Sequence, residues 1–102
     1  MEIHWTDMEA IEPQQRESAE SRIQRLAEHQ DDLVDLRIVG RQTNHHRHGS
    51  SEVRITCRVK GADLIAAREG GDLGAALHDA LAAFEHELHR LRDKRRSKRK
   101  RG

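Results

Sequence analysis

Histidine is the residue type in this chain best suited to bind a metal, and three histidines cluster in one segment. His45, His46 and His48 lie in NHHRHGSS, which contains no acidic residue. Zinc takes four ligands, and the only cysteine, Cys57, alternates with apolar residues and is expected to face the core. We therefore predict no metal site and interpret the segment as an exposed hairpin tip whose histidines add charge near an acidic surface. A small metal-handling protein is an open alternative, which a zinc titration would test.

Residue patterns typical of catalysis are absent from the sequence. It contains no nucleophile elbow, no glycine-rich phosphate loop and no HExxH motif. The glycine pair at residues 70–71 is better explained as the end of a strand. A helix N-terminus can bind an anion, but Glu69 and Asp72 would repel one here. We therefore expect a protein that is not an enzyme, with no cofactor and no small-molecule substrate.

Positive charge is concentrated at the C-terminal end. Residues 90–102 hold nine Lys or Arg and one acid, a net charge of +8, whereas residues 1–89 hold ten against seventeen acids, a net charge of −7. A strongly basic end usually meets a polyanion, most often nucleic acid. A solvated tail that aids solubility is the alternative; we favour nucleic acid because basic residues continue back into the preceding helix. Only Trp5 and Phe84 are aromatic, so we expect phosphate and shape recognition of folded RNA rather than base stacking.

Length and composition predict one small domain. With 102 residues, of which 34% are hydrophobic and 36% charged, the chain can build only a modest core. No apolar run is long enough for a membrane span or signal peptide, and one cysteine suits a reducing compartment. We therefore expect a cytoplasmic protein with no membrane partner. It would consist of a domain over residues 1–94 and a basic, disordered tail over residues 95–102.

The stretch from Asp72 to Lys94 shows the strongest helical pattern. Large apolar residues recur in steps of three and four, which predicts a helix with one narrow buried stripe: Leu73, Leu77, Leu81, Phe84, Leu88 and Leu91. Asp72 is expected to cap this helix. His86, Arg90 and Lys94 are spaced by four and line up on one flank, away from the stripe.

A second helix is predicted over residues 13–29, with Pro13 at its first position. Its buried side is expected to carry Ala19, Ile23, Leu26 and Ala27. One flank holds Arg22 and Arg25 with no acid among its residues, which indicates an anionic partner. The alternative, that the two arginine stems merely cover apolar surface, is equally open from this helix alone.

Alternating apolar residues predict four strands, over residues 2–6, 33–41, 52–60 and 63–68. In the second of these, Val34, Leu36 and Ile38 are expected to face the core. The resulting order, β-α-β-β-β-α, favours an α+β two-layer sandwich: a four-stranded sheet with the two helices packed on one face. The three consecutive strands should form an antiparallel meander.

On these residues the chain resembles the ribosome hibernation promoting factor family, also called the sigma-54 modulation protein family, which includes the ribosome-associated translation inhibitors. The resemblance runs from Glu2 to about Lys94. It is carried by PQQRESAESRIQRLAEHQDDL, LRIVG, EVRITCRVKGADLIAARE and DLGAALHDALAAFEHELHRLRDK. It implies the same fold and the short form of the family, which lacks the C-terminal dimerisation domain of long members.

The resemblance implies a factor that binds the small ribosomal subunit and the 70S ribosome, occupies the mRNA and tRNA channel, and inhibits translation in stationary phase. Carried over by position, the rRNA-binding residues are Arg22, Arg25, Arg90 and Lys94, with His86 where the family often has a basic residue. We expect the four cations to form one cradle for ribosomal phosphates. A general binder of double-stranded or structured RNA, not tied to the ribosome, is the alternative.

Two departures from the family weaken the expected grip on rRNA. Gly74 stands where the family commonly has an aromatic residue, and Ala83 stands where a lysine is common. We hypothesise that the basic segment RRSKRKR compensates, which adds Arg95, Arg96 and Lys98 to the candidate RNA-binding residues.

Overall fold

Residues 1–42 and 51–101 are described by the computed structural model, with side chains described as far as residue 97. The elements in chain order are β1 (Glu2–Thr6), α1 (Pro13–His29), β2 (Leu33–Gln42), β3 (Ser51–Val59), β4 (Ala62–Gly70) and α2 (Leu73–Arg101). This order confirms the predicted β-α-β-β-β-α arrangement and the α+β class. The histidine-rich segment, expected to be a hairpin tip, falls outside the described residues.

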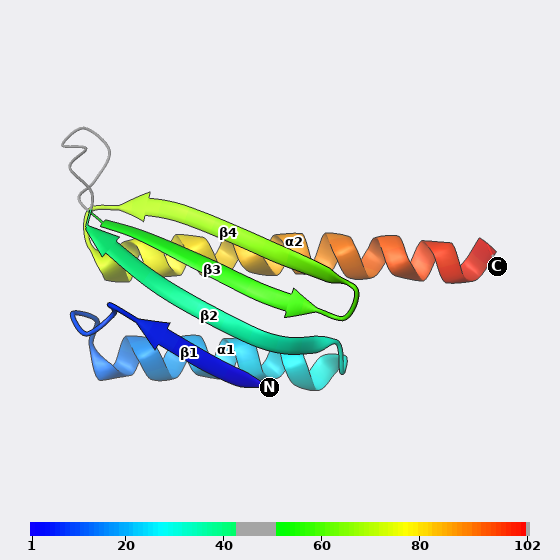
Figure 1. Ribbon diagram of the computed structural model, residues 1–102, viewed down its shortest axis with the longest axis horizontal. Coiled ribbons are helices and arrows are strands. Elements are labelled where there is room, and N and C mark those ends of the chain that lie inside the picture. Colours follow the sequence, from blue (N-terminus) through cyan, green and yellow to red (C-terminus); the bar gives the residue numbers. More distant parts are fainter. Residues whose placement is uncertain (43–50, 102) are drawn as a thin grey trace.

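The four strands form one sheet in the order β1-β2-β3-β4. β1 runs parallel to β2, and β2, β3 and β4 form the predicted antiparallel meander. Both helices lie on the same face of this sheet, α1 behind β1 and β2 and α2 behind β3 and β4 (Figure 1). The sheet thus holds the two helices next to one another, and neither described helix covers its other face.

The core lies between the sheet and the helices. Every second residue of β3 is completely buried: Val53, Ile55, Cys57 and Val59. Phe84 and Leu88 of α2 are also completely buried. The other four residues of the stripe pack with them, Leu91 being only partly buried: Leu73, Leu77, Leu81 and Leu91. Ala19 and Ile23 of α1 close the other side, with Leu26 and Ala27 partly buried against them. The helical periodicity and the alternation in β3 therefore predict these core residues correctly.

The start of β2 differs from the prediction. Leu33 is buried while Val34 is 47% exposed, because the pairing of β2 with β3 shifts register between Leu33 and Asp35. Such a bulge inserts an extra residue and resets the alternation of the strand. Both residues are apolar, so hydrophobicity alone does not indicate which one turns inward.

The end of α2 also differs from the prediction. The helix continues to Arg101 rather than ending near Lys94. Arg and Lys are good helix formers, and no glycine or proline interrupts the segment before Gly102. A helix of 29 residues is about 43 Å long, and the molecule measures 50 × 27 × 17 Å. α2 therefore carries the basic segment beyond the edge of the sheet (Figure 1). The proposed division of the chain at residue 94 stays a prediction.

Local residues explain where α2 and the β3–β4 turn begin. The Asp72 carboxylate accepts a hydrogen bond of 2.8 Å from the Ala75 backbone N–H, which confirms the predicted cap. Gly61 has a φ of +83° in the turn between β3 and β4, a conformation that favours glycine. Neither helix in the described ranges is long and apolar enough to cross a membrane.

Candidate nucleic-acid interface

A groove of about 560 Å³ runs between the two helices. From α1 it is lined by Arg22, Arg25, Leu26 and His29, and from α2 by Glu85, His89 and Arg92. The predicted cations Arg22 and Arg25 therefore do face the second helix. Most of the polar lining is guanidinium or imidazole, chemistry that suits an anionic partner.

Arg22 is tied to α2 by an ion pair across this groove. Its Nε and Nη2 atoms both approach Oε1 of Glu85, at 2.9 and 2.8 Å, and both side chains are about 30% exposed. This pair holds the helices together but also neutralises the Arg22 charge. Arg25 is exposed and makes no ion pair within the described part of the chain, so it is the α1 cation free to meet an anion.

The most important cation at this interface is one that the sequence analysis does not single out. Arg92 is only 4% exposed. Its Nε donates to Oδ2 of Asp32 at 3.0 Å, and its Nη2 donates to Oδ1 of Asp32 at 2.6 Å and to the Leu26 carbonyl at 2.9 Å. Arg92 thereby joins α2 to the end of α1 and the start of β2. Its position four residues after Leu88, beside the buried stripe, is the signal that could have indicated this role.

The same pair perturbs the ionisation of Asp32. The hydrogen bonds from Arg92 lower the pKa of the Asp32 carboxyl, an effect that outweighs the opposing influence of burial. Asp32 is therefore a carboxylate at neutral pH, and both of its oxygens are occupied by Arg92.

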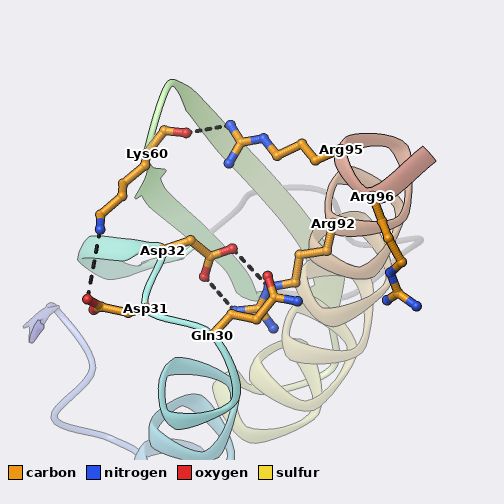
Figure 2. A pocket seen from close by; sticks show the side chains of 7 residues that line it. All are labelled: Gln30, Asp31, Asp32, Lys60, Arg92, Arg95 and Arg96. Carbon is orange, nitrogen blue, oxygen red and sulfur yellow. Dashed lines mark hydrogen bonds and ion pairs between the residues drawn. The ribbon is translucent and has the colours of Figure 1, made fainter. Parts of the chain in front are cut away.

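A second hollow adjoins the groove, near the C-terminal end of α1 (Figure 2). It contains two of the predicted residues, Arg95 and Arg96. Arg95 is half-buried and donates to the Lys60 carbonyl, whereas Arg96 is exposed and pairs with Asp93 at 3.3 Å. Arg92 lines both the groove and this hollow.

The remaining predicted cations do not line the groove. Successive helical residues turn by about 100°, which places His86, Arg90 and Lys94 about 100°, 140° and 180° around α2 from Glu85. They are exposed on the outer and far flanks of the helix, and Arg90 pairs with Glu87 at 3.5 Å. The four cations expected to form one cradle are thus divided between the groove and the far flank of α2. Whether these residues bind RNA stays a prediction, and the Lys98 side chain lies outside the described residues.

Gly74, the first departure noted in the sequence, lies at the contact between the helices. A Cβ atom built on it would lie 2.4 Å from Nε2 of Gln15 on α1. A larger residue there requires Gln15 to move. The hollow beside it is lined by residues of both helices, including Ser18, Leu77 and His78.

The described residues contain no cluster of three or more His, Cys, Asp or Glu that could hold a metal ion. Cys57 is completely buried, and burial raises the pKa of its thiol to about 12, so it is protonated at neutral pH. The groove and the hollow are lined mainly by guanidinium, imidazole and ammonium groups, whose chemistry suits phosphate oxygens.

The fold and this helical layer define a class: small two-layer α+β proteins whose helices lie on one face of the sheet and carry basic side chains. Within that class, residues 1–96 match the model of the family described as sigma 54 modulation protein / S30EA ribosomal protein. The chain belongs to this family.

Two solved structures show the same fold. A ribosomal subunit interface protein from Coxiella burnetii is 19% identical, with a TM-score of 0.73 over 91% of this chain and 99% of that one. The N-terminal domain of Thermus thermophilus Protein Y is 20% identical, with a TM-score of 0.68 over 89% of this chain and 97% of that one. Among curated proteins, none matches this sequence.

Proposed function

We propose that this protein binds the ribosome and inhibits translation by occupying the mRNA and tRNA channel of the small subunit. Membership of the S30EA ribosomal protein family supports ribosome binding, as does the fold shared with a ribosomal subunit interface protein. The observation that carries the proposal is the cationic helical layer. Arg25 makes no ion pair with any described residue there, and α2 extends a basic segment beyond the sheet.

The mechanism we propose is steric. A body 50 Å long and 17 Å thick fits an elongated channel, where it would exclude mRNA and tRNA without any chemical step. Guanidinium groups bind phosphate oxygens through charge-assisted hydrogen bonds, and many such contacts together give affinity without reading sequence. Arg25, Arg90 and Lys94 are exposed and are the residues we assign to rRNA phosphates in the cytoplasmic ribosome.

Sedimentation tests the proposal directly. A stationary-phase lysate separated on a sucrose gradient should show the protein in the 30S and 70S fractions, and added pure protein should reduce translation in a cell-free system. A protein found only at the top of the gradient, with no effect on translation, would refute the proposal.

A general binder of structured RNA is the second candidate. It is favoured by one observation: the described cations suit phosphates, while Phe84 is buried and Trp5 is partly buried, so neither offers an open base-stacking platform. Competition separates the two functions. If an excess of random RNA duplex displaces the protein from ribosomes with comparable affinity, the general binder is correct; if ribosomes are strongly preferred, the hibernation factor is.

A further inference from the structure

The hollow shown in Figure 2 has features that the groove between the helices lacks. It has a volume of about 440 Å³, and three separate parts of the chain form it: the link between α1 and β2, the β3–β4 turn and α2. Its lining residues are Gln30, Asp31, Asp32, Lys60, Arg92, Arg95 and Arg96.

One hydrogen-bond donor in this hollow is unsatisfied. Nη1 of Arg92 is buried and has no partner, although Nε and Nη2 of the same guanidinium are bound to Asp32 and the Leu26 carbonyl. Buried donors in folded proteins nearly always have an acceptor, so an exception calls for an unseen partner. Gln30, an exposed residue, lines the same hollow, and its side chain overlaps the Arg92 guanidinium in the view of Figure 2.

The charge of the lining indicates the chemistry of that partner. Four cationic side chains and two carboxylates line the hollow, a net charge of +2, which becomes +1 when Asp93, the partner of Arg96, is counted. The Asp32 carboxylate cannot compensate further, because Arg92 occupies both of its oxygens. Asp31 is fully exposed and only 3.8 Å from Nζ of Lys60. A neutral acceptor would accept a hydrogen bond from Nη1 but would leave the positive charge of the hollow uncompensated. An anion with several oxygens would both accept that hydrogen bond and compensate the charge.

We propose that this hollow binds a single phosphoryl group of an RNA backbone. Arg92 Nη1 donates to one oxygen when the Gln30 side chain turns aside. Arg96, held only by its exposed pair with Asp93, can reach a second oxygen, and Lys60 adds charge. Arg95, anchored through Nη2 to the Lys60 carbonyl, adds further charge. This inference rests on the proposed function: it names one docking point for RNA at the junction of both helices and the sheet.

Inorganic phosphate is the probe, titrated against chloride at constant ionic strength. We expect the ¹H–¹⁵N signal of Arg92 Nε to shift and saturate, and the melting temperature to rise with the same concentration dependence. Arg96→Gln should weaken this binding at least about threefold. Arg54→Gln is the matched control, because it removes the same charge from an exposed arginine on the open face of the sheet, outside the hollow. Lys60→Gln gives a second variant if Arg96→Gln does not fold.

The outcomes separate this site from its alternatives. A shift without saturation, or equal weakening by Arg54→Gln, would overturn the site. A short oligoribonucleotide should compete with phosphate; if phosphate binds and the oligoribonucleotide does not compete, the hollow takes a free phosphate and the RNA assignment is wrong. If the protein sediments with ribosomes but does not bind phosphate, this inference is refuted and the proposed function stands. Absence from ribosomal fractions would instead refute the proposed function.

Discussion

At the scale of single residues, the Arg92–Asp32 pair is the interaction on which the helical layer depends most. The Arg92 side chain is 3% exposed and that of Asp32 is 13% exposed, and they lie 60 residues apart in the chain. Removing one partner of a buried ion pair leaves the other charge buried without compensation, which lowers the free energy of unfolding strongly. Replacing both partners by apolar residues would change it much less. The pair is therefore a sensitive test of the structure.

Asp32→Asn should destabilise the protein by about 3 to 5 kcal/mol, measured as the free energy of unfolding in urea at pH 7. Asp31→Asn, which changes a fully exposed neighbour, should have little effect. Equal stabilities of the two variants would contradict the burial described for this pair.

The pH dependence of stability follows from the same carboxyl. Because its pKa is lowered in the folded state, its contribution is fully present above the unfolded value of about 3.9 and is lost as the pH falls through the folded pKa. Urea unfolding between pH 6 and 2 should therefore show a loss of stability below about pH 4 that is smaller in Asp32→Asn. An identical acid profile for the two proteins would exclude Asp32 as the group responsible.

Cys57 should be unreactive in the folded protein. Its thiol is completely buried and its pKa is raised to about 12, so thiolate is scarce at pH 8. A colorimetric thiol reagent should react at the rate of global unfolding and become fast only in denaturant. Rapid labelling of the native protein would show that β3 opens locally.

At the scale of elements, close packing between the β1–α1 link and the sheet accounts for one glycine. A Cβ atom on Gly40 of β2 would lie 2.5 Å from both the Asp7 carbonyl oxygen and Sδ of Met8. The carbonyl belongs to the backbone and cannot simply turn aside. Gly40 therefore lets the link between β1 and α1 lie directly on the end of β2.

Gly40→Ala should cost about 1 to 3 kcal/mol of stability, because the added methyl group forces the backbone to shift. Gly71→Ala serves as the control, since nothing lies within 4 Å of the corresponding Cβ position. Chemical denaturation of both variants measures the difference. If Gly40→Ala were as stable as Gly71→Ala, the link would not pack as described.

At the scale of the whole molecule, exposed cations lie on both layers, the helices and the open face of the sheet. The helical side carries Arg25, Arg90 and Lys94, and the open face of the sheet also shows arginines, among them Arg41 and Arg54. The proposed function requires the helical cations to bind phosphates, while those of the open face need not. This difference can be measured through the salt dependence of ribosome binding.

Replacing both Arg90 and Lys94 by Gln should weaken ribosome binding and lower the slope of log K against log salt by about 1 to 2, because two phosphate contacts are lost. Replacing both Arg41 and Arg54 by Gln removes the same charge from the opposite layer and should leave the slope nearly unchanged. Equal effects of the two double variants would mean that only net charge matters.

Local patterns determined much of this protein. The order of its elements, its core and its basic end follow from periodicity and composition, because the face of a helix or strand that is buried depends on residues close in sequence. The exposure of Val34 could not be predicted in this way, because a bulge depends on how β2 pairs with β3 rather than on the sequence of β2 alone.

Only the tertiary structure decided which cations come together. Spacing places His86, Arg90 and Lys94 on one flank of α2, but it does not determine which flank faces α1. That choice is set by how each helix rests on the sheet, and it unites Arg22 with Glu85, 63 residues away, and Arg92 with Asp32, 60 residues away. A charged residue beside an apolar stripe becomes a surface cation or a buried partner according to the neighbour that packing brings to it.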